Sequence, residues 1–102
     1  MSIIIAGYFR IDPAKTEQCK AAAIEMMRAT RAEPGCRFYY ITHDLEVAGV
    51  FHVSEEWESE AAIASHLQTP HMQGLKAALG SWGVQAVDIK RYDASEGRPL
   101  SL

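Results

Sequence analysis

The sequence predicts a single α+β domain in which an antiparallel sheet carries helices on one face. Four segments are rich in apolar, β-branched or aromatic residues, and two longer segments place apolar side chains at helical spacing. They follow one another as β-α-β-β-α-β, which is the order of a ferredoxin-like arrangement with a four-stranded antiparallel sheet. The 102 residues have room for one domain, residues 1–92, followed by a C-terminal tail, residues 93–102.

The first strand is predicted over residues 2–11, where both alternating sets of side chains are apolar. Asp12 and Pro13 predict the start of a helix, and the run 33–35, Glu-Pro-Gly, predicts its end. Between them one helical stripe is formed by Cys19, Ala23, Met26, Met27 and Thr30. We therefore expect this helix to cover the sheet with one face.

The remaining elements follow from aromatic content and capping residues. Residues 36–43 and 50–57 predict two strands of a hairpin. Ser59 is the expected N-cap of the second helix, which breaks and restarts at Thr69-Pro70 and ends at the glycines between residues 80 and 83. The last strand is predicted over residues 84–92.

The apolar character of both faces of the first two strands predicts a homodimer. With helices on one side only, the opposite face of a monomer should be polar, yet the first two strands are apolar on both faces. Twofold association that brings two sheets face to face would bury this surface, so we expect a homodimer.

Charge and composition exclude several classes of partner. The formal net charge is −3, the pI is near 5.7, and no run of Lys or Arg occurs, so nucleic acid is not an expected partner. The N-terminal segment has neither a basic region before an apolar stretch nor the length of a membrane span, which predicts a cytoplasmic protein without a membrane partner. Cys19 and Cys36 form no CxxC motif and are interpreted as free thiols.

The segment from Glu55 to Met72 concentrates reactive side chains where a strand gives way to a helix. His66 lies on the apolar stripe with Ile63 and Leu67, so it should point toward the sheet. It is either a hydrogen-bonded core histidine or a catalytic base.

Trp57 and Glu55 share one face of their strand because side chains alternate. Trp57 is either a core aromatic or the wall of a binding pocket. A carboxylate on this apolar face needs a partner, and a salt bridge from Glu55 to Arg37 or Arg91 is expected.

Four further residues are candidates for substrate binding: Tyr40, His52, His71 and Met72. The hairpin register decides whether Tyr40 or its neighbour Tyr39 faces the pocket. His52 is solvent-exposed, at the dimer interface or in the pocket, and His71 either closes the pocket mouth or lies on the surface. With no HxxxH, no HExxH and no clustered cysteines, we expect no metal.

Three runs carry a resemblance to a known family: Glu33-Pro34-Gly35-Cys36, Glu55-Glu56-Trp57-Glu58-Ser59 and His66-Leu67-Gln68-Thr69-Pro70-His71-Met72. They resemble the antibiotic biosynthesis monooxygenase domain, a family of dimeric α+β barrels, over about residues 3–92. The third run is most similar to the bacterial quinol monooxygenases.

The resemblance implies a cofactor-independent monooxygenase that oxidises a small aromatic quinol or phenol with O2. His66 would be the base or an anion-stabilising donor, Trp57 a wall and Glu55 an orienting carboxylate. The chain has no Asn, which weakens the haem-degrading and anthrone-oxygenating alternatives, and no Gly-rich phosphate loop for a flavin or nucleotide. An isomerase or signal-degrading enzyme and a non-catalytic binding or stress-response dimer remain alternatives on the same fold.

Overall fold

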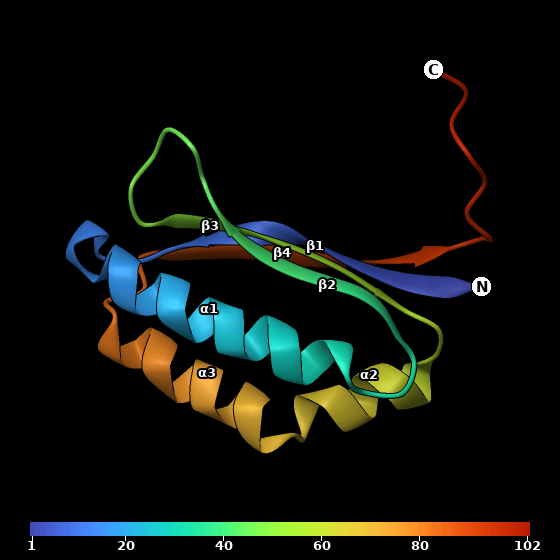
Figure 1. The fold of residues 1–102 in the computed structure, drawn as a ribbon, viewed down its shortest axis with the longest axis horizontal. Coiled ribbons are helices and arrows are strands. Elements are labelled where there is room, and N and C mark those ends of the chain that lie inside the picture. The colour runs from blue at the N-terminus through green and yellow to red at the C-terminus, as the bar shows by residue number, and fades with distance from the viewer.

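The computed structural model describes residues 1–102 and confirms the ferredoxin-like α+β fold. Four antiparallel strands lie in the order β2-β3-β1-β4, and the helices all lie on one face of the sheet (Figure 1). The strands are β1 Ser2–Arg10, β2 Cys36–His43, β3 Val50–Trp57 and β4 Ala86–Ala94. The helices are η1 Pro13–Lys15, a short 3-10 turn, and α1 Thr16–Arg31, α2 Glu60–Leu67 and α3 Pro70–Ser81. None of them combines the length and the apolar character that crossing a membrane requires.

Side-chain caps set the helix starts. The hydroxyls of Ser59 and Thr69 each accept the backbone N–H group three residues further on and begin α2 and α3, as predicted. Asp12 caps η1 instead, so α1 itself begins three residues after Pro13. Helix α3 ends at Ser81, between the two glycines that were expected to end it. Strand β4 begins and ends two residues later in the chain than predicted.

The core lies between the helices α1, α2 and α3 and the inner faces of β1, β2 and β3. The predicted α1 stripe is buried at Cys19, Ala23, Met26 and Thr30, and both cysteines are free. Phe9 and Phe51 stack with ring centroids 5.5 Å apart at one end of the sheet. Trp57 lies fully buried at the other end of β3, where α2 begins.

The hairpin register determines which face each side chain of β2 joins. A bulge between Cys36 and Phe38 interrupts the alternation, so Tyr39 rather than Tyr40 lies opposite Glu55 on the inner face. Tyr39 is 2% exposed, whereas Tyr40 is 47% exposed on the outer face. Strict alternation from Cys36 would bury Tyr40, but the extra residue of the bulge turns Tyr39 inward and Tyr40 outward.

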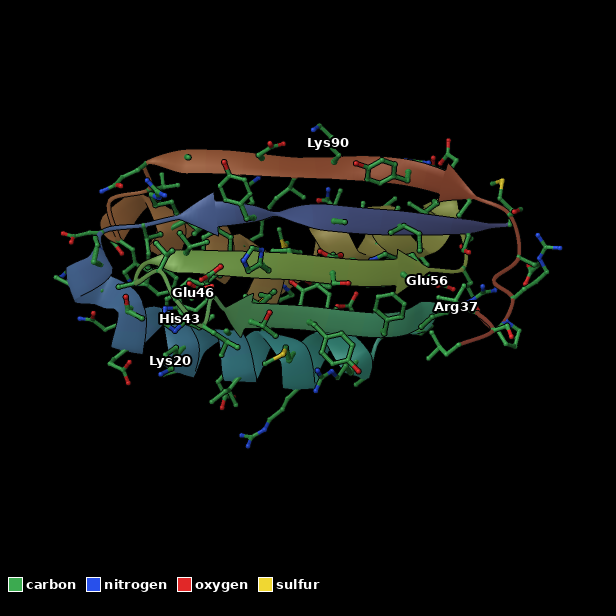
Figure 2. The ribbon with its side chains drawn as sticks, turned by 90° about the horizontal axis from the view of Figure 1, so that it is seen from above. Lys20, Arg37, His43, Glu46, Glu56 and Lys90 are labelled. Carbon is green, nitrogen blue, oxygen red and sulfur yellow. The ribbon has the colours of Figure 1, made fainter.

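The outer face of the sheet carries no helix. In Figure 2 this face points toward the viewer, with Glu56 of β3 and Lys90 of β4 among its labelled residues. Polar groups on it include the ion pair between Arg37 and Glu56, with Nη1 and Oε2 3.0 Å apart. Aromatic side chains accompany them, including Tyr40 and Tyr92, which are about half exposed. The apolar outer face expected from the sequence is thus open in a single chain.

Candidate active site

A cavity of about 390 Å³ lies between the β4 side of the sheet and the helices α2 and α3. This volume is within the range of pockets that hold small organic ligands. Its lining is mostly apolar, with the ionisable groups confined to a few positions. The lining residues are Ile5, Glu55, Glu60, Ile63, Ala64, His66, Leu67, Met72, Ile89 and Arg91.

His66 is the histidine of this cavity and is only 2% exposed. Its ring packs against two inner-face aromatics, Trp57 at a centroid distance of 4.7 Å and Tyr39 at 5.5 Å. Its Nδ1 lies 2.9 Å from Oε2 of Glu33, a residue outside the cavity lining. A neutral imidazole that donates Nδ1–H to a carboxylate keeps a lone pair on Nε2, so Nε2 is the nitrogen available for chemistry.

Glu33 reaches His66 because the turn after α1 docks onto α2. Gly35 in this turn has φ +84°, and a Cβ placed on it would lie 2.5 Å from the Cβ of Ala62 in α2. The N–H of Glu58 donates to the carbonyl of Gly35 at 2.9 Å and fixes the same approach. The run of residues 33–36 thus places a carboxylate beside the second helix.

His71 shares the same carboxylate oxygen as His66. Thr69 caps α3 and donates its hydroxyl to the carbonyl of His66 at 2.7 Å, which ties the end of α2 to the start of α3. His71 in the first turn of α3 then places Nε2 2.7 Å from Oε2 of Glu33. Glu33, His66 and His71 therefore converge although Pro70 interrupts the helical spacing, an arrangement with donor atoms suited to a metal ion.

Glu55 is the second ionisable group inside the cavity. It is 7% exposed and accepts a hydrogen bond from Nε1–H of Trp57 at 2.9 Å. Burial raises the pKa of the Glu55 carboxyl to about 7, with a smaller contribution from the charge of Glu33 and an opposing one from the Trp57 hydrogen bond. At neutral pH this carboxyl is poised between the protonated and ionised forms, so it can serve as acid or base.

Arg91 and Glu60 lie at the more exposed part of the cavity lining. The Arg91 guanidinium pairs with both Glu60 and Asp93, and these ion pairs hold its pKa above its usual range. Arg91 is therefore neutralised by its own neighbours.

The structure brings five predicted residues into one region and separates two others. His66, Glu55 and Met72 line the cavity. Trp57 is fully buried behind them and supports His66 and Glu55, so it is not a wall of the cavity. His71 contacts Glu33 without lining the cavity.

Tyr40 was wrong as a pocket residue, and His52 is solvent-exposed, which is one of the three positions left open for it. Both lie on the outer sheet face, Tyr40 because of the β2 bulge and His52 because it alternates with the inner residues of β3. The Arg31 guanidinium lies over the ring of Tyr40, with its Cζ 4.8 Å from the ring centroid. Nε2 of His52 forms a hydrogen bond with Oδ2 of Asp44 at 2.8 Å.

The expected salt bridge from Glu55 to Arg37 or Arg91 was also wrong. Arg37 lies on the outer face and pairs with Glu56, while Arg91 pairs with Glu60 and Asp93. Glu33 was not predicted as a site residue, although it belongs to a run that carried the family resemblance. Locally this run indicates only the end of a helix, and the docking of the turn against α2 reveals the role of the carboxylate.

Together the fold and the cavity define a small α+β domain with a histidine and a carboxyl facing an apolar pocket. The family model described as antibiotic biosynthesis monooxygenase matches residues 2–78. The chain therefore belongs to this family.

Two solved structures and one curated protein illustrate the similarity. A Deinococcus radiodurans protein, provisionally assigned as an antibiotic biosynthesis monooxygenase, superposes with a TM-score of 0.87 at 26% identity, covering 99% of both chains. A Caulobacter crescentus protein with the same provisional assignment gives a TM-score of 0.84 at 27% identity, covering 93% of this chain and 91% of that one. YcnE of Bacillus subtilis, provisionally named a monooxygenase, is 29% identical over 94 residues, which are 92% of this chain and 99% of YcnE.

Proposed function

We propose that the protein is a cofactor-independent monooxygenase that oxidises a small aromatic phenol or quinol with O2. The observation that carries the proposal is the position of His66: its ring faces an apolar cavity while Nδ1 is held by Glu33. A carboxylate on Nδ1 fixes the ring orientation and stabilises the imidazolium that forms when Nε2 accepts a proton. The family membership and the provisional naming of YcnE as a monooxygenase support the reaction class.

The reaction uses the substrate as its own reductant. His66 Nε2 takes the phenolic proton, and the resulting anion transfers one electron to O2. The two radicals join as a peroxide at a ring carbon, and His66 returns its proton to the outer peroxide oxygen. The ring carbon then gives up its proton as the O–O bond breaks, and the departing hydroxide takes up that proton and leaves as water. A phenol and one O2 thus give a quinone and one water, with the proton on His66 returned to the departing oxygen.

We further propose that the active form is a homodimer joined through the outer sheet faces. The helix-free face and the half-exposed Tyr40 and Tyr92 support this, because a monomer would leave these aromatic groups in water. The tail after β4 also extends on the side of the sheet away from the helices (Figure 1). Light scattering at micromolar concentration tests the proposal, and a monodisperse monomer would contradict it.

Oxygen uptake above the autoxidation rate, measured with a panel of phenols and a menadiol-like quinol, tests the activity. We expect His66→Gln to lower turnover by about 100-fold or more, in the range of a lost general base. His52→Gln is the matched control, because His52 also bonds to a carboxylate but lies on the opposite sheet face. Two results would contradict the proposal. One is that no substrate raises oxygen uptake above the autoxidation rate, and the other is that a folded His66→Gln variant keeps the full rate of uptake.

One observation favours a second candidate, a non-oxidative isomerase. Glu55 and His66 face the same cavity, and an acid paired with a base can move a proton between two carbons. Substrate conversion without O2 consumption would support this candidate. Saturable ligand binding without any turnover would instead indicate a binding protein.

A further inference from the structure

We infer that Glu33, His66 and His71 form a binding site for a divalent transition-metal ion, with Zn2+ as the best-suited ion. One carboxylate oxygen and two imidazole nitrogens converge here from three elements: the turn after α1, the end of α2 and the start of α3. The site stands on these three side chains and does not depend on the oxygenase activity.

The spacing of the donor atoms suits a shared ion. Glu33 Oε2 lies 2.9 Å from His66 Nδ1 and 2.7 Å from His71 Nε2, and all three atoms lie within 4.8 Å of one another. Ligands about 2.0 to 2.2 Å from a zinc ion lie about 3 to 3.5 Å apart. Movements on the order of 1 Å by the side chains of Glu33 and of the partly exposed His71 would reach this spacing and leave the buried His66 in place.

The charges also favour a cation. The Glu33 carboxylate is 12% exposed, and its ion-pair partners are the two histidines, with no Lys or Arg among them. Histidine carries a full positive charge only when protonated, so neutral imidazoles leave this carboxylate without a cation. A Zn2+ ion supplies that charge and accepts both nitrogen lone pairs, and imidazole and carboxylate are ligands it prefers.

The histidines of this site also have structural support. Thr69 fixes the relative position of the two helix ends through its bond to the His66 carbonyl. Trp57 and Tyr39 pack against the ring of His66 and limit its rotation. Held ligands lose less conformational freedom on binding, which favours affinity.

Metal binding would change the role of His66 in the cavity. A metal on Nδ1 requires the tautomer in which Nε2 carries the proton, so Nε2 becomes a hydrogen-bond donor and can no longer accept a proton. Zn2+ is therefore expected to inhibit turnover. This consequence alone rests on the proposed function.

Isothermal titration of the chelator-treated protein with zinc chloride tests the site. We expect one Zn2+ per chain for the natural protein and for His52→Gln, and binding weakened by about tenfold or more in His71→Gln and Glu33→Gln. His52 with Asp44 is a histidine–carboxylate pair that lacks a third ligand, so it reports on incidental surface binding.

Thermal unfolding with and without Zn2+ gives a second readout, because a ligand that binds only the folded state raises the Tm. The rise should occur in the natural protein and be smaller at the same Zn2+ concentration in His71→Gln, a change at a partly exposed position. No saturable binding to the natural protein, unchanged affinity in His71→Gln, or an equal loss in His52→Gln would each overturn the inference.

Discussion

Replacing Glu55 by glutamine separates the effect of a buried charge from the effect of packing, because the two side chains have nearly the same shape. Glutamine keeps an oxygen that accepts the hydrogen bond from Trp57. It does not titrate. The stability difference between Glu55→Gln and the natural protein should therefore report directly on the ionisation of this carboxyl.

The magnitude follows from the pKa of Glu55, which burial raises from 4.5 to about 7. Between these pH values the folded state binds one proton more than the unfolded state, so the natural protein loses stability as the pH rises. About 2.5 pH units at about 1.4 kcal/mol each give about 3.5 kcal/mol in total, of which about 3 kcal/mol falls between pH 4.5 and 8. This stability is present below pH 4.5 and is lost as the pH rises through 7.

Urea unfolding of both proteins between pH 4.5 and 8, at one fixed protein concentration, measures the difference. We expect the free energy of unfolding of Glu55→Gln, relative to the natural protein, to increase by about 3 kcal/mol across this interval. A difference that stays constant would mean that the carboxyl titrates alike in both states. A difference of opposite slope would mean that the folded protein stabilises the ionised form, and either result refutes the reasoning.

Three further substitutions test the supporting contacts. Gly35→Ala should destabilise the protein by about 1 to 3 kcal/mol in urea unfolding, because φ is +84° and the new Cβ would meet Ala62; a neutral result would show that the turn is not held against α2. The pKa of Asp44 is lowered to about 2, mainly by its hydrogen bond with His52. Asp44→Asn should therefore be less stable than the natural protein at neutral pH, and the difference should disappear as the pH falls through 2. Trp57→Phe removes the hydrogen bond that lowers the pKa of the buried carboxyl on β3, so the pH at which that carboxyl ionises should rise; a fall would contradict this.

The strands and helix starts could be predicted from sequence because local rules determine them. Aromatic and β-branched content placed β2 and β3, and Ser59 and Thr69 cap the helices that they were expected to cap. His66 was placed on the inner side of its helix for the same reason. These inferences required only neighbours within a turn or a strand.

The rest of the site depends on contacts between distant segments. Tyr40 was misassigned because the bulge after Cys36 leaves no unambiguous mark in the sequence and reverses the strand faces. The convergence of Glu33 with His66 and His71 depends on how a turn docks against two helices, 33 and 38 residues further along the chain. The spacing of the two histidines in the sequence does not reveal this convergence, because Pro70 starts a separate helix between them.

The ionisation of Glu55 also distinguishes the two candidate reactions. A phenolate formed by proton transfer to His66 would be repelled by an ionised Glu55 in the same cavity and stabilised by a neutral one that donates a hydrogen bond. An oxygenase therefore needs the neutral carboxyl, whereas an isomerase needs one of the two groups to give a proton and the other to take one. Glu55→Gln is a permanently neutral donor that cannot exchange a proton. Oxygen uptake should survive this substitution and lose its decline above pH 7, while isomerase turnover should be abolished, so loss of oxygen uptake in the folded variant would count against the phenolate mechanism.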